Sequence, residues 1–278
     1  MGKFIVYKDF KLYNDDCVNI MNEMAKNGQC VDLTVTSPPY DNLRTYNNSS
    51  EWSFDKFKEV AKGIWNVTAD GGVVVWVVGD SVINGSESGT SFRQALYFME
   101  CGFKLHDTMI YEKNSSSFPA SKNSKRYTQI FEYMFVFVKG KIHDCTLIAD
   151  KENKWAGFTN WGTNTMYNKE GVLVKTTDIK PVPKFSLRNN IWKYSVGFND
   201  KRFGKHPAVF PLQLAIDHIL SWSKEDHVIF DPFLGSGTVM DACIKTNRTK
   251  LIGVEIDKEY FSIIERKVDY YKSSNDVK

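Results

Sequence analysis

The run from Val73 to Val78 is apolar at every position, and it constrains the fold more than any other stretch of the chain. A strand with one solvated face alternates apolar and polar side chains, whereas a strand covered on both faces is apolar throughout. Val31 to Ser37 is a second short run, rich in β-branched residues. Both runs therefore predict strands of a mostly parallel sheet with helices on its two faces.

The rest of the chain alternates similar runs with stretches of helical period, which is typical of an α/β fold. Ser53 is the expected N-cap of one helix, and Gly71-Gly72 its expected end. Between 140 and about 204 the alternation is lost, and Lys, Asn, Thr and Trp are frequent. Further strands are predicted at 10–17, 103–113, 131–140, 227–233 and 251–257, and helices at 18–28, 53–72, 91–102, 206–223, 236–247 and 258–272.

The distribution of charge indicates a polyanionic partner. The net charge is only +3, but residues 139–205 hold 13 Lys and Arg against 6 Asp and Glu. The stretch from Lys113 to Arg126 adds four cations and no acidic residue. Two basic segments rich in Ser and Asn favour nucleic acid as the partner, although a solvated Lys-rich surface would have the same composition.

Cysteine and histidine usage argues against a metal site. The five cysteines form no CxxC pair, and the five histidines form no HExxH motif. We therefore expect a reducing compartment, no disulfide framework and no metal. No apolar run approaches the ~18 residues of a membrane span, so no membrane segment is expected.

A glycine turn lies between Val228 and Cys243. A predicted strand ends at Asp231, and Gly235 and Gly237 lead directly into a helix, where backbone N–H groups can face a ligand. The turn is neither GxGxxG nor GxxxxGK[ST], which excludes the dinucleotide fingerprint and the phosphate P-loop. About twenty residues later, acidic side chains at a strand end suit the hydroxyls of a ribose. The pattern predicts a nucleoside-type cofactor such as S-adenosylmethionine, although a plain strand–turn–helix junction would look the same.

The second strand run ends in Ser37-Pro38-Pro39-Tyr40. Proline cannot donate to a sheet ladder and fixes φ, so the strand stops there in a stiff turn. The Ser37 hydroxyl and a fixed carbonyl can accept the two hydrogens of an exocyclic amino group, and Tyr40 can stack on the ring that carries it. Taken alone, this motif favours a purely structural Pro-Pro turn over an amino-group site.

Taken together, TSPPY and DPFLGSGT resemble the motifs of the amino-methylating DNA methyltransferases, which carry [DNS]PP[YFW] and a glycine-turn S-adenosylmethionine site. The resemblance covers nearly the whole chain, and its motif order resembles the β group of these enzymes. It implies an α/β, Rossmann-like methyltransferase sheet with an inserted target-recognition region. The implied division is 1–139 for the catalytic half, 140–205 for target recognition and 206–278 for the cofactor-binding half.

The resemblance also implies roles for individual residues. LYNDDC resembles the segment whose acidic residue, here Asp16, reaches the adenine amino group, and HPAVFP resembles a further cofactor-contacting segment. The implied catalytic residues are Ser37, Pro38, Pro39 and Tyr40. The cofactor set is Asp16, His206, Pro207, Ala208, Phe210, Asp231, Pro232, Phe233, Gly235, Ser236, Gly237, Thr238, Glu255 and Asp257. The expected DNA contacts are Arg44, Tyr46, Lys122, Arg126, Arg188, Lys201 and Arg202.

The implied reaction is transfer of a methyl group from S-adenosylmethionine to an amino nitrogen of a flipped base in double-stranded DNA, which leaves S-adenosylhomocysteine. A C5-cytosine route is set aside because no cysteine follows a proline. In this family S/TPPY goes mostly with cytosine N4, so Ser37 favours cytosine N4 over adenine N6. A methyltransferase that acts on RNA or protein, and a binding module with a decayed cofactor site, are less favoured. A second copy of the chain and a cognate restriction endonuclease are left open as partners, in the cytoplasm of a bacterium or as a phage-encoded protein.

Overall fold

The computed structural model describes residues 3–39, 52–115, 125–159, 165–175, 180–197, 200–204 and 211–275. The chain divides into two compact units, a larger one of residues 1–146 and 190–278 and a smaller one of residues 147–189. None of the described helices is long and apolar enough to span a membrane.

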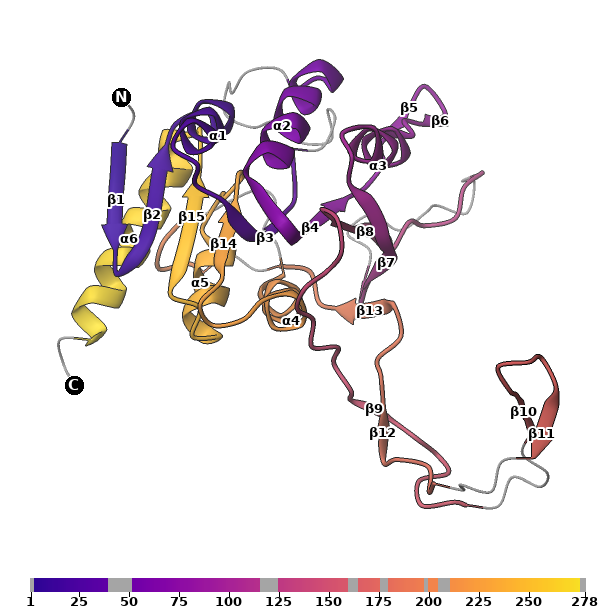
Figure 1. Cartoon of the computed structure of the whole chain (residues 1–278). Coiled ribbons are helices and arrows are strands. Elements are labelled where there is room, and N and C mark those ends of the chain that lie inside the picture. The colour runs from indigo at the N-terminus through magenta and orange to yellow at the C-terminus, as the bar shows by residue number, and fades with distance from the viewer. Residues whose placement is uncertain are drawn as a thin grey trace. The chain divides into compact units, whose positions relative to one another are not determined.

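The described part of the larger unit contains a nine-stranded mixed sheet (Figure 1). Only β1 and β8 run against their neighbours, so the remaining strands all point in one direction. The carboxyl ends of β2, β15, β14, β3 and β4 therefore share one edge of the sheet. The strand order is β1 (Lys3–Tyr7), β2 (Asp9–Asn14), β15 (Lys250–Val254), β14 (Val228–Asp231), β3 (Val31–Thr36), β4 (Thr68–Val78), β8 (Phe131–Val138), β7 (Lys104–Lys113) and β13 (Ile191–Tyr194).

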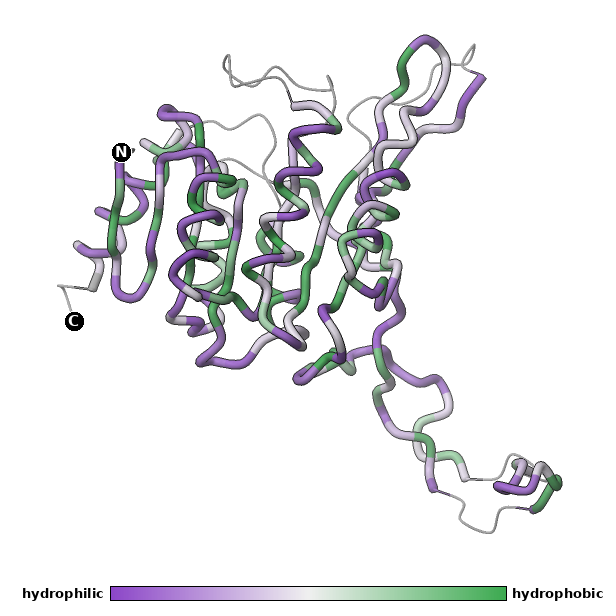
Figure 2. Tube along the Cα trace, turned by 45° about the horizontal axis from the view of Figure 1, so that its top comes forward, coloured by the Kyte–Doolittle hydropathy of each residue, from purple (hydrophilic) through white to green (hydrophobic). Residues whose placement is uncertain are grey.

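Helices cover both faces of this sheet, as the apolar strands predict (Figure 1). One face carries α1 (Cys17–Lys26), α2 (Phe54–Val67) and α3 (Thr90–Glu100). The other carries α4 (Leu212–Trp222), α5 (Thr238–Lys245) and α6 (Lys258–Asn275). Hydrophobic residues run along the central strands in Figure 2.

Because side chains alternate between the two faces of a strand, the sheet contributes buried residues to the helix layers on both of its faces. Trp76 and Phe230 belong to the core cluster formed with α1, α2 and α3. Their neighbours Val75 and Ile229 are fully buried and must point to the opposite face, because successive side chains alternate. Each such buried side chain contributes about 1.5–3 kcal/mol of burial energy.

The end of α2 differs from the predicted one. The helix begins after the Ser53 N-cap as expected, but it ends at Val67, and Gly71 lies inside β4. The Thr68 hydroxyl donates to the Ile64 carbonyl at 2.7 Å, and Lys139 Nζ donates to the Trp65 and Thr68 carbonyls. These bonds satisfy the Ile64 and Trp65 carbonyls in the last turn without a glycine, and the chain enters the strand directly. The sequence prediction also missed β1.

A short hairpin, β5 (Val82–Ile83) and β6 (Ser86–Glu87), follows β4. The smaller unit consists of paired short strands: β9 (Lys151–Glu152) with β12 (Phe185–Ser186), and β10 (Thr165–Tyr167) with β11 (Leu173–Lys175). This unit is shorter than the predicted recognition region 140–205, because β13 belongs to the main sheet. The recognition role of the region stays a prediction.

Candidate active site

Four neighbouring strands bring the predicted site residues to one edge of the sheet. Asp16 follows β2, Glu255 follows β15, Asp231 ends β14 and Ser37 follows β3. Parallel strands place their carboxyl ends side by side, which is where ligands bind in open α/β sheets. Segments that lie far apart in the sequence thus meet in one place.

A buried hydrogen bond joins the two predicted motifs. The Thr36 hydroxyl donates to Asp231 Oδ1 at 2.6 Å, and the same oxygen accepts the Phe233 N–H at 3.0 Å. Thr36 and Asp231 are 1% and 4% exposed. Burial raises the pKa of Asp231 to about 7, although both hydrogen bonds act in the opposite direction. The carboxyl group thus holds the start of the Ser-Pro-Pro turn against the glycine loop. Ser37 and Pro39 are half-buried and Pro38 is buried.

Glu255 supports the glycine loop from the neighbouring strand. Its Oε2 accepts the Gly235 N–H at 2.7 Å, and its Oε1 accepts the Asp257 N–H at 2.8 Å. Burial raises the pKa of Glu255 to about 7. Asp257 caps α6, because its Oδ1 accepts the Glu259 and Tyr260 N–H groups. Of the two acidic residues predicted for the ribose, Glu255 is therefore the one directed at the loop.

The amino end of α5 can hold an anionic group. Its N-cap is Gly237, which has a φ of 83° and offers no side chain to the first helical N–H groups. Ser236 and Thr238 on either side line a cavity of about 470 Å³, together with Gln213, Asp241, Lys267 and other side chains of the larger unit. An uncapped helix start beside a cavity suits the carboxylate of an amino acid. The hydrogen-bonding groups of this edge therefore fit S-adenosylmethionine. Acidic side chains can accept hydrogen bonds from the nucleoside, and backbone N–H groups at the start of α5 can donate to the carboxylate.

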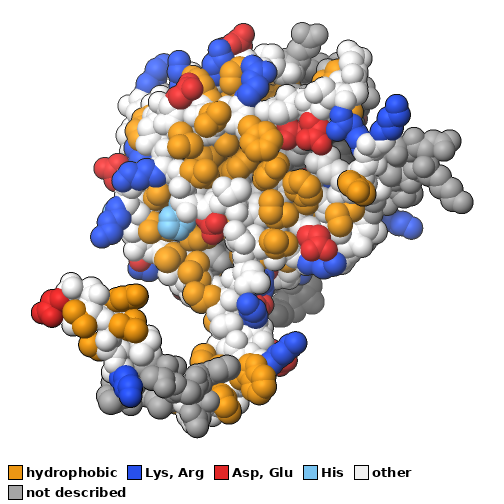
Figure 3. Space-filling model, turned by 90° about the vertical axis from the view of Figure 1, so that its right-hand side faces the viewer, with side chains coloured by type: hydrophobic (Ala, Val, Ile, Leu, Met, Phe, Trp, Pro, Cys, Tyr) orange, Lys and Arg blue, Asp and Glu red, His pale blue; other side chains and the backbone are white. Residues whose placement is uncertain are grey.

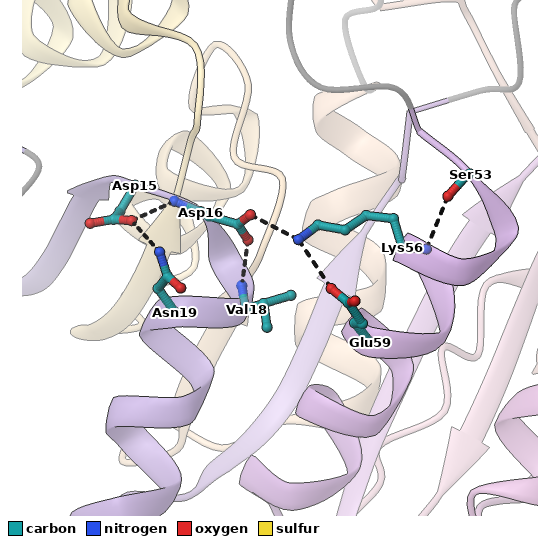
Figure 4. A network of polar contacts seen from close by, with 7 residues as sticks. All are labelled: Asp15, Asp16, Val18, Asn19, Ser53, Lys56 and Glu59. Atoms are coloured by element: carbon teal, nitrogen blue, oxygen red, sulfur yellow. Dashed lines mark hydrogen bonds and ion pairs between the residues drawn. The ribbon is translucent and has the colours of Figure 1, made fainter.

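Asp16 is the N-cap of α1. Its Oδ1 accepts the Val18 N–H at 2.8 Å, and its Oδ2 accepts Lys56 Nζ, also at 2.8 Å (Figure 4). The Asn14 side chain donates to the Glu255 and Ile256 carbonyls, which fixes the end of β2 against the end of β15. Asp16 is thereby set close to the strand that carries Glu255. Lys56 was not among the predicted site residues, because nothing local in the sequence marks it.

Asp80 is a second residue that the sequence prediction did not assign. It follows β4 at the same edge, is 7% exposed, and accepts the Ser91 N–H at 3.0 Å and the Ser88 hydroxyl at 3.1 Å. The Ser91 hydroxyl also donates to it. Asp80 thus anchors the start of α3, whose N-cap Gly89 has no side chain. The available signal was an acidic residue that follows the apolar run Val73 to Val78 after a single glycine.

The predicted DNA contacts that the structure describes lie in three places. Arg126 donates to the Gly85 carbonyl in the β5–β6 turn. Arg202 pairs with Asp200 at 2.6 Å and lies over the Phe203 and Tyr270 rings, while the neighbouring Lys201 is exposed. In the smaller unit, Arg188 forms an ion pair with Asp150. Their roles in DNA binding stay predictions.

Several predicted residues lie outside the described part of the chain. They are Tyr40, Arg44, Tyr46, Lys122, His206, Pro207, Ala208 and Phe210. Within the described ranges, no group of three or more His, Cys, Asp or Glu side chains could hold a metal ion.

Comparison with known proteins identifies the family. A family model described as DNA methylase matches residues 31–266. The chain belongs to this DNA methylase family. Its relatives include the orphan methyltransferase M.BamHII of Bacillus amyloliquefaciens, with 50% identity over 249 residues that cover 88% of this chain and 91% of the relative. The type II methyltransferase M.SmaI of Serratia marcescens is 24% identical over 280 residues and covers 85% and 84% of the two chains.

Solved structures support the fold of this DNA methylase. The complex of M1.HpyAVI with S-adenosylmethionine has a TM-score of 0.61 and 22% identity, covering 93% of this chain and 99% of the other. PvuII DNA methyltransferase, described as cytosine-N4-specific, has a TM-score of 0.63 and 18% identity, covering 96% and 94%. The predicted methyltransferase fold and family are confirmed. The DNA methylase is an enzyme, and S-adenosylmethionine is its cofactor.

Proposed function

We propose that this DNA methylase transfers the methyl group of S-adenosylmethionine to the N4 amino group of a cytosine flipped out of double-stranded DNA. The Thr36–Asp231 hydrogen bond is the observation that carries the proposal. It ties the strand that ends in Ser37-Pro38 to the loop that is suited to the methyl donor. An amino group held by the first motif would therefore lie beside a cofactor held by the second.

The proposed chemistry is positioning and electrostatic stabilisation. The lone pair of a base amino group is delocalised into the ring, so the nitrogen is a poor nucleophile. Hydrogen bonds from its two hydrogens to Ser37 Oγ and the Pro38 carbonyl would favour a pyramidal nitrogen with an available lone pair. The nitrogen then forms a bond to the methyl carbon, the carbon–sulfur bond breaks with its electron pair on sulfur, and the proton leaves to solvent. Flipping the base costs a few kcal/mol.

For the cofactor, we propose three contacts from the described residues. Glu255 accepts the ribose hydroxyls, Asp16 accepts the adenine amino group, and the amino end of α5 binds the carboxylate. The burial of Glu255 and the uncapped start of α5 support these roles. The contacts predicted for His206, Pro207, Ala208 and Phe210 are part of the same proposal.

The choice of cytosine rests on Ser37, because Ser in this position of the motif goes mostly with cytosine N4 in the family that the sequence resembles. Mass spectrometry of nucleosides tests it, after duplex DNA is incubated with the protein and S-adenosylmethionine that carries a deuterated methyl group. We expect labelled N4-methylcytosine, and none with Ser37→Ala. Labelled N6-methyladenine alone would overturn the choice of cytosine. Preferential labelling of RNA in a competition with duplex DNA would instead support an RNA methyltransferase.

Target recognition is proposed for residues 140–205, with help from the basic loop around Arg126. The excess of positive charge in this stretch supports it. We also propose that the enzyme acts in the bacterial cytoplasm, where chromosomal DNA is found, since M.BamHII and M.SmaI are methyltransferases of bacteria. A cognate endonuclease stays a prediction.

A homodimer is proposed through an apolar stripe on α3. Phe92, Leu96 and Met99 share one side of the helix and are 51%, 60% and 44% exposed. Figure 3 shows hydrophobic side chains gathered on the side of the molecule that carries α3. Arg93 near the start of this helix and Glu100 at its end both oppose the helix dipole within one chain. In an antiparallel α3 pair centred on Leu96, each Arg93 would face a Glu100, so a second copy has the matching charge.

Sedimentation velocity tests the dimer. We expect the wild-type protein to sediment as a dimer and Leu96→Lys as a monomer, whereas Leu220→Lys, an exposed control on α4, leaves the dimer intact. A monomeric wild-type protein would contradict this proposal.

A further inference from the structure

The Lys56 ammonium group bridges two helices at the nucleoside side of the candidate site. It lies in the first turn of α2 and donates to Asp16 Oδ2 at 2.8 Å and to Glu59 Oε2 at 3.3 Å. Figure 4 shows its side chain reaching from α2 to the start of α1. We propose that Lys56 is a positioning residue, which holds the Asp16 carboxylate in the orientation that accepts the adenine amino group of S-adenosylmethionine. This inference rests on the role proposed above for Asp16.

Asp16 is held at both oxygens by different parts of the chain. Its Oδ1 is fixed by the Val18 N–H of its own helix. A carboxylate with this single bond can still turn about its axis, because the second oxygen has no fixed partner. Lys56 supplies that partner from α2 and restricts the rotation. The remaining lone pairs of Asp16 are then directed before any ligand arrives, which lowers the entropy that binding must overcome.

The side chain of Lys56 is constrained enough to do this. It is 26% exposed, equal to Asp16, whereas Glu59 is 60% exposed. Desolvation opposes the charge of Lys56, but the hydrogen bonds to Asp16 and Glu59 outweigh it, so that its pKa is raised. The Lys56 backbone is fixed as well, because its N–H donates to the Ser53 hydroxyl that caps α2. The Lys56 side chain is thus charged, and the backbone from which it extends is fixed.

The two helices do not depend on this ion pair for their packing. Cys17, Ile20 and Met21 of α1 share a buried core cluster with Phe57 and Val60 of α2. Replacing the ammonium group while keeping an apolar stem should therefore leave the helices in place. This separates a role in orientation from a role in folding.

Isothermal calorimetry with two ligands tests the inference. One ligand is S-adenosylhomocysteine, and the other is its analogue with hydrogen in place of the 6-amino group of the purine. We expect the wild-type protein to bind S-adenosylhomocysteine about tenfold more tightly, as for one hydrogen bond to a charged group. Lys56→Met should lose most of this preference by weakening S-adenosylhomocysteine alone. Lys56→Arg should retain it, and Glu59→Gln, which removes the negative charge of the more distant partner, should leave it unchanged.

The outcomes separate this inference from the proposed function. Equal weakening of both ligands by Lys56→Met would show a general structural role and overturn the inference. An unchanged preference in Lys56→Met would also overturn it, while the binding of S-adenosylhomocysteine by the wild-type protein would still support the cofactor site. No binding of S-adenosylhomocysteine by the wild-type protein would contradict the proposed function itself. A thermal melt of each variant confirms that it is folded.

Discussion

Two threonines on β3 offer a matched test of the bond between the motifs. Thr36 donates to the buried Asp231 carboxyl group at 2.6 Å. Thr34, two residues earlier, is also fully buried, but its hydroxyl has no hydrogen-bond partner among the residues that the structure describes. Residues two apart point to the same face of a strand. Thr36→Val and Thr34→Val thus make the same chemical change in similar surroundings, with and without a bond to lose.

The expected magnitudes follow from the two environments. Thr36→Val removes a bond to a buried carboxyl group and should cost about 1.5–3 kcal/mol of unfolding free energy. Thr34→Val removes a hydroxyl that is already buried without a partner, so the change should be neutral or stabilising by up to about 1–3 kcal/mol. In a chain of this size each kcal/mol shifts the melting temperature by roughly 2–4 °C. Thr36→Val should therefore melt several degrees below the wild type and Thr34→Val at or above it.

The assay is urea or thermal unfolding at two pH values, together with methyl transfer. The loss caused by Thr36→Val should be larger at pH 8 than at pH 5.5, because the lost donor favours the ionised form of Asp231 and its pKa is about 7. Methyl transfer should fall in Thr36→Val and persist in Thr34→Val. Equal stability changes in the two variants at both pH values would refute the reasoning.

Further predictions concern buried acids and an exposed cation. The pKa values of Asp231 and Glu255 are raised to about 7 in the fold, so the unfolded chain binds fewer protons than the folded chain between pH 4 and 7. The unfolding free energy should therefore fall as pH rises through this window and level off above it. Urea unfolding at several pH values measures this change. Calorimetry should find that S-adenosylmethionine binds the wild-type protein more tightly as pH rises through 7, because only the ionised Glu255 accepts two ribose hydroxyls. The Glu255→Gln variant should bind S-adenosylmethionine more weakly and with little pH dependence. A parallel pH dependence in both proteins would refute this role of Glu255. Asp80→Ala should cost about 2–3 kcal/mol of stability, because it leaves buried donors without their acceptor, whereas the exposed Asp70→Ala should cost almost nothing; similar melting temperatures would argue against the anchor at α3. Lys201→Ala should weaken DNA binding and reduce the slope of log K against log salt by about 0.9. An unchanged slope in a salt titration would show that Lys201 does not contact the DNA phosphates.

The sequence predicts the chemistry of the site better than its contacts. Ser37-Pro38 and Asp231 to Thr238 are recognisable because proline stiffness and glycine conformation act within a few residues. The Thr36–Asp231 bond joins residues 195 positions apart, and it depends on which strands are neighbours in the sheet. No local pattern encodes that order.

Two other features show the same limit. The bond between Lys56 and Asp16 depends on how α1 packs against α2. In the sequence, Lys56 therefore cannot be distinguished from any other lysine of a predicted helix. The end of α2 was predicted at a glycine pair, but Thr68 and the distant Lys139 bind the Ile64 and Trp65 carbonyls earlier in the chain. Propensity marks where a helix can end, and tertiary hydrogen bonds decide where it does.

The most direct test of the central claim is a structure of the enzyme with S-adenosylhomocysteine and a duplex that contains its target base. The account predicts an extrahelical cytosine whose N4 amino group lies about 3 Å from Ser37 Oγ and from the Pro38 carbonyl oxygen, on the side that faces the cofactor sulfur. A base that stays stacked in the duplex, or an amino group bound by other residues away from the sulfur, would contradict it.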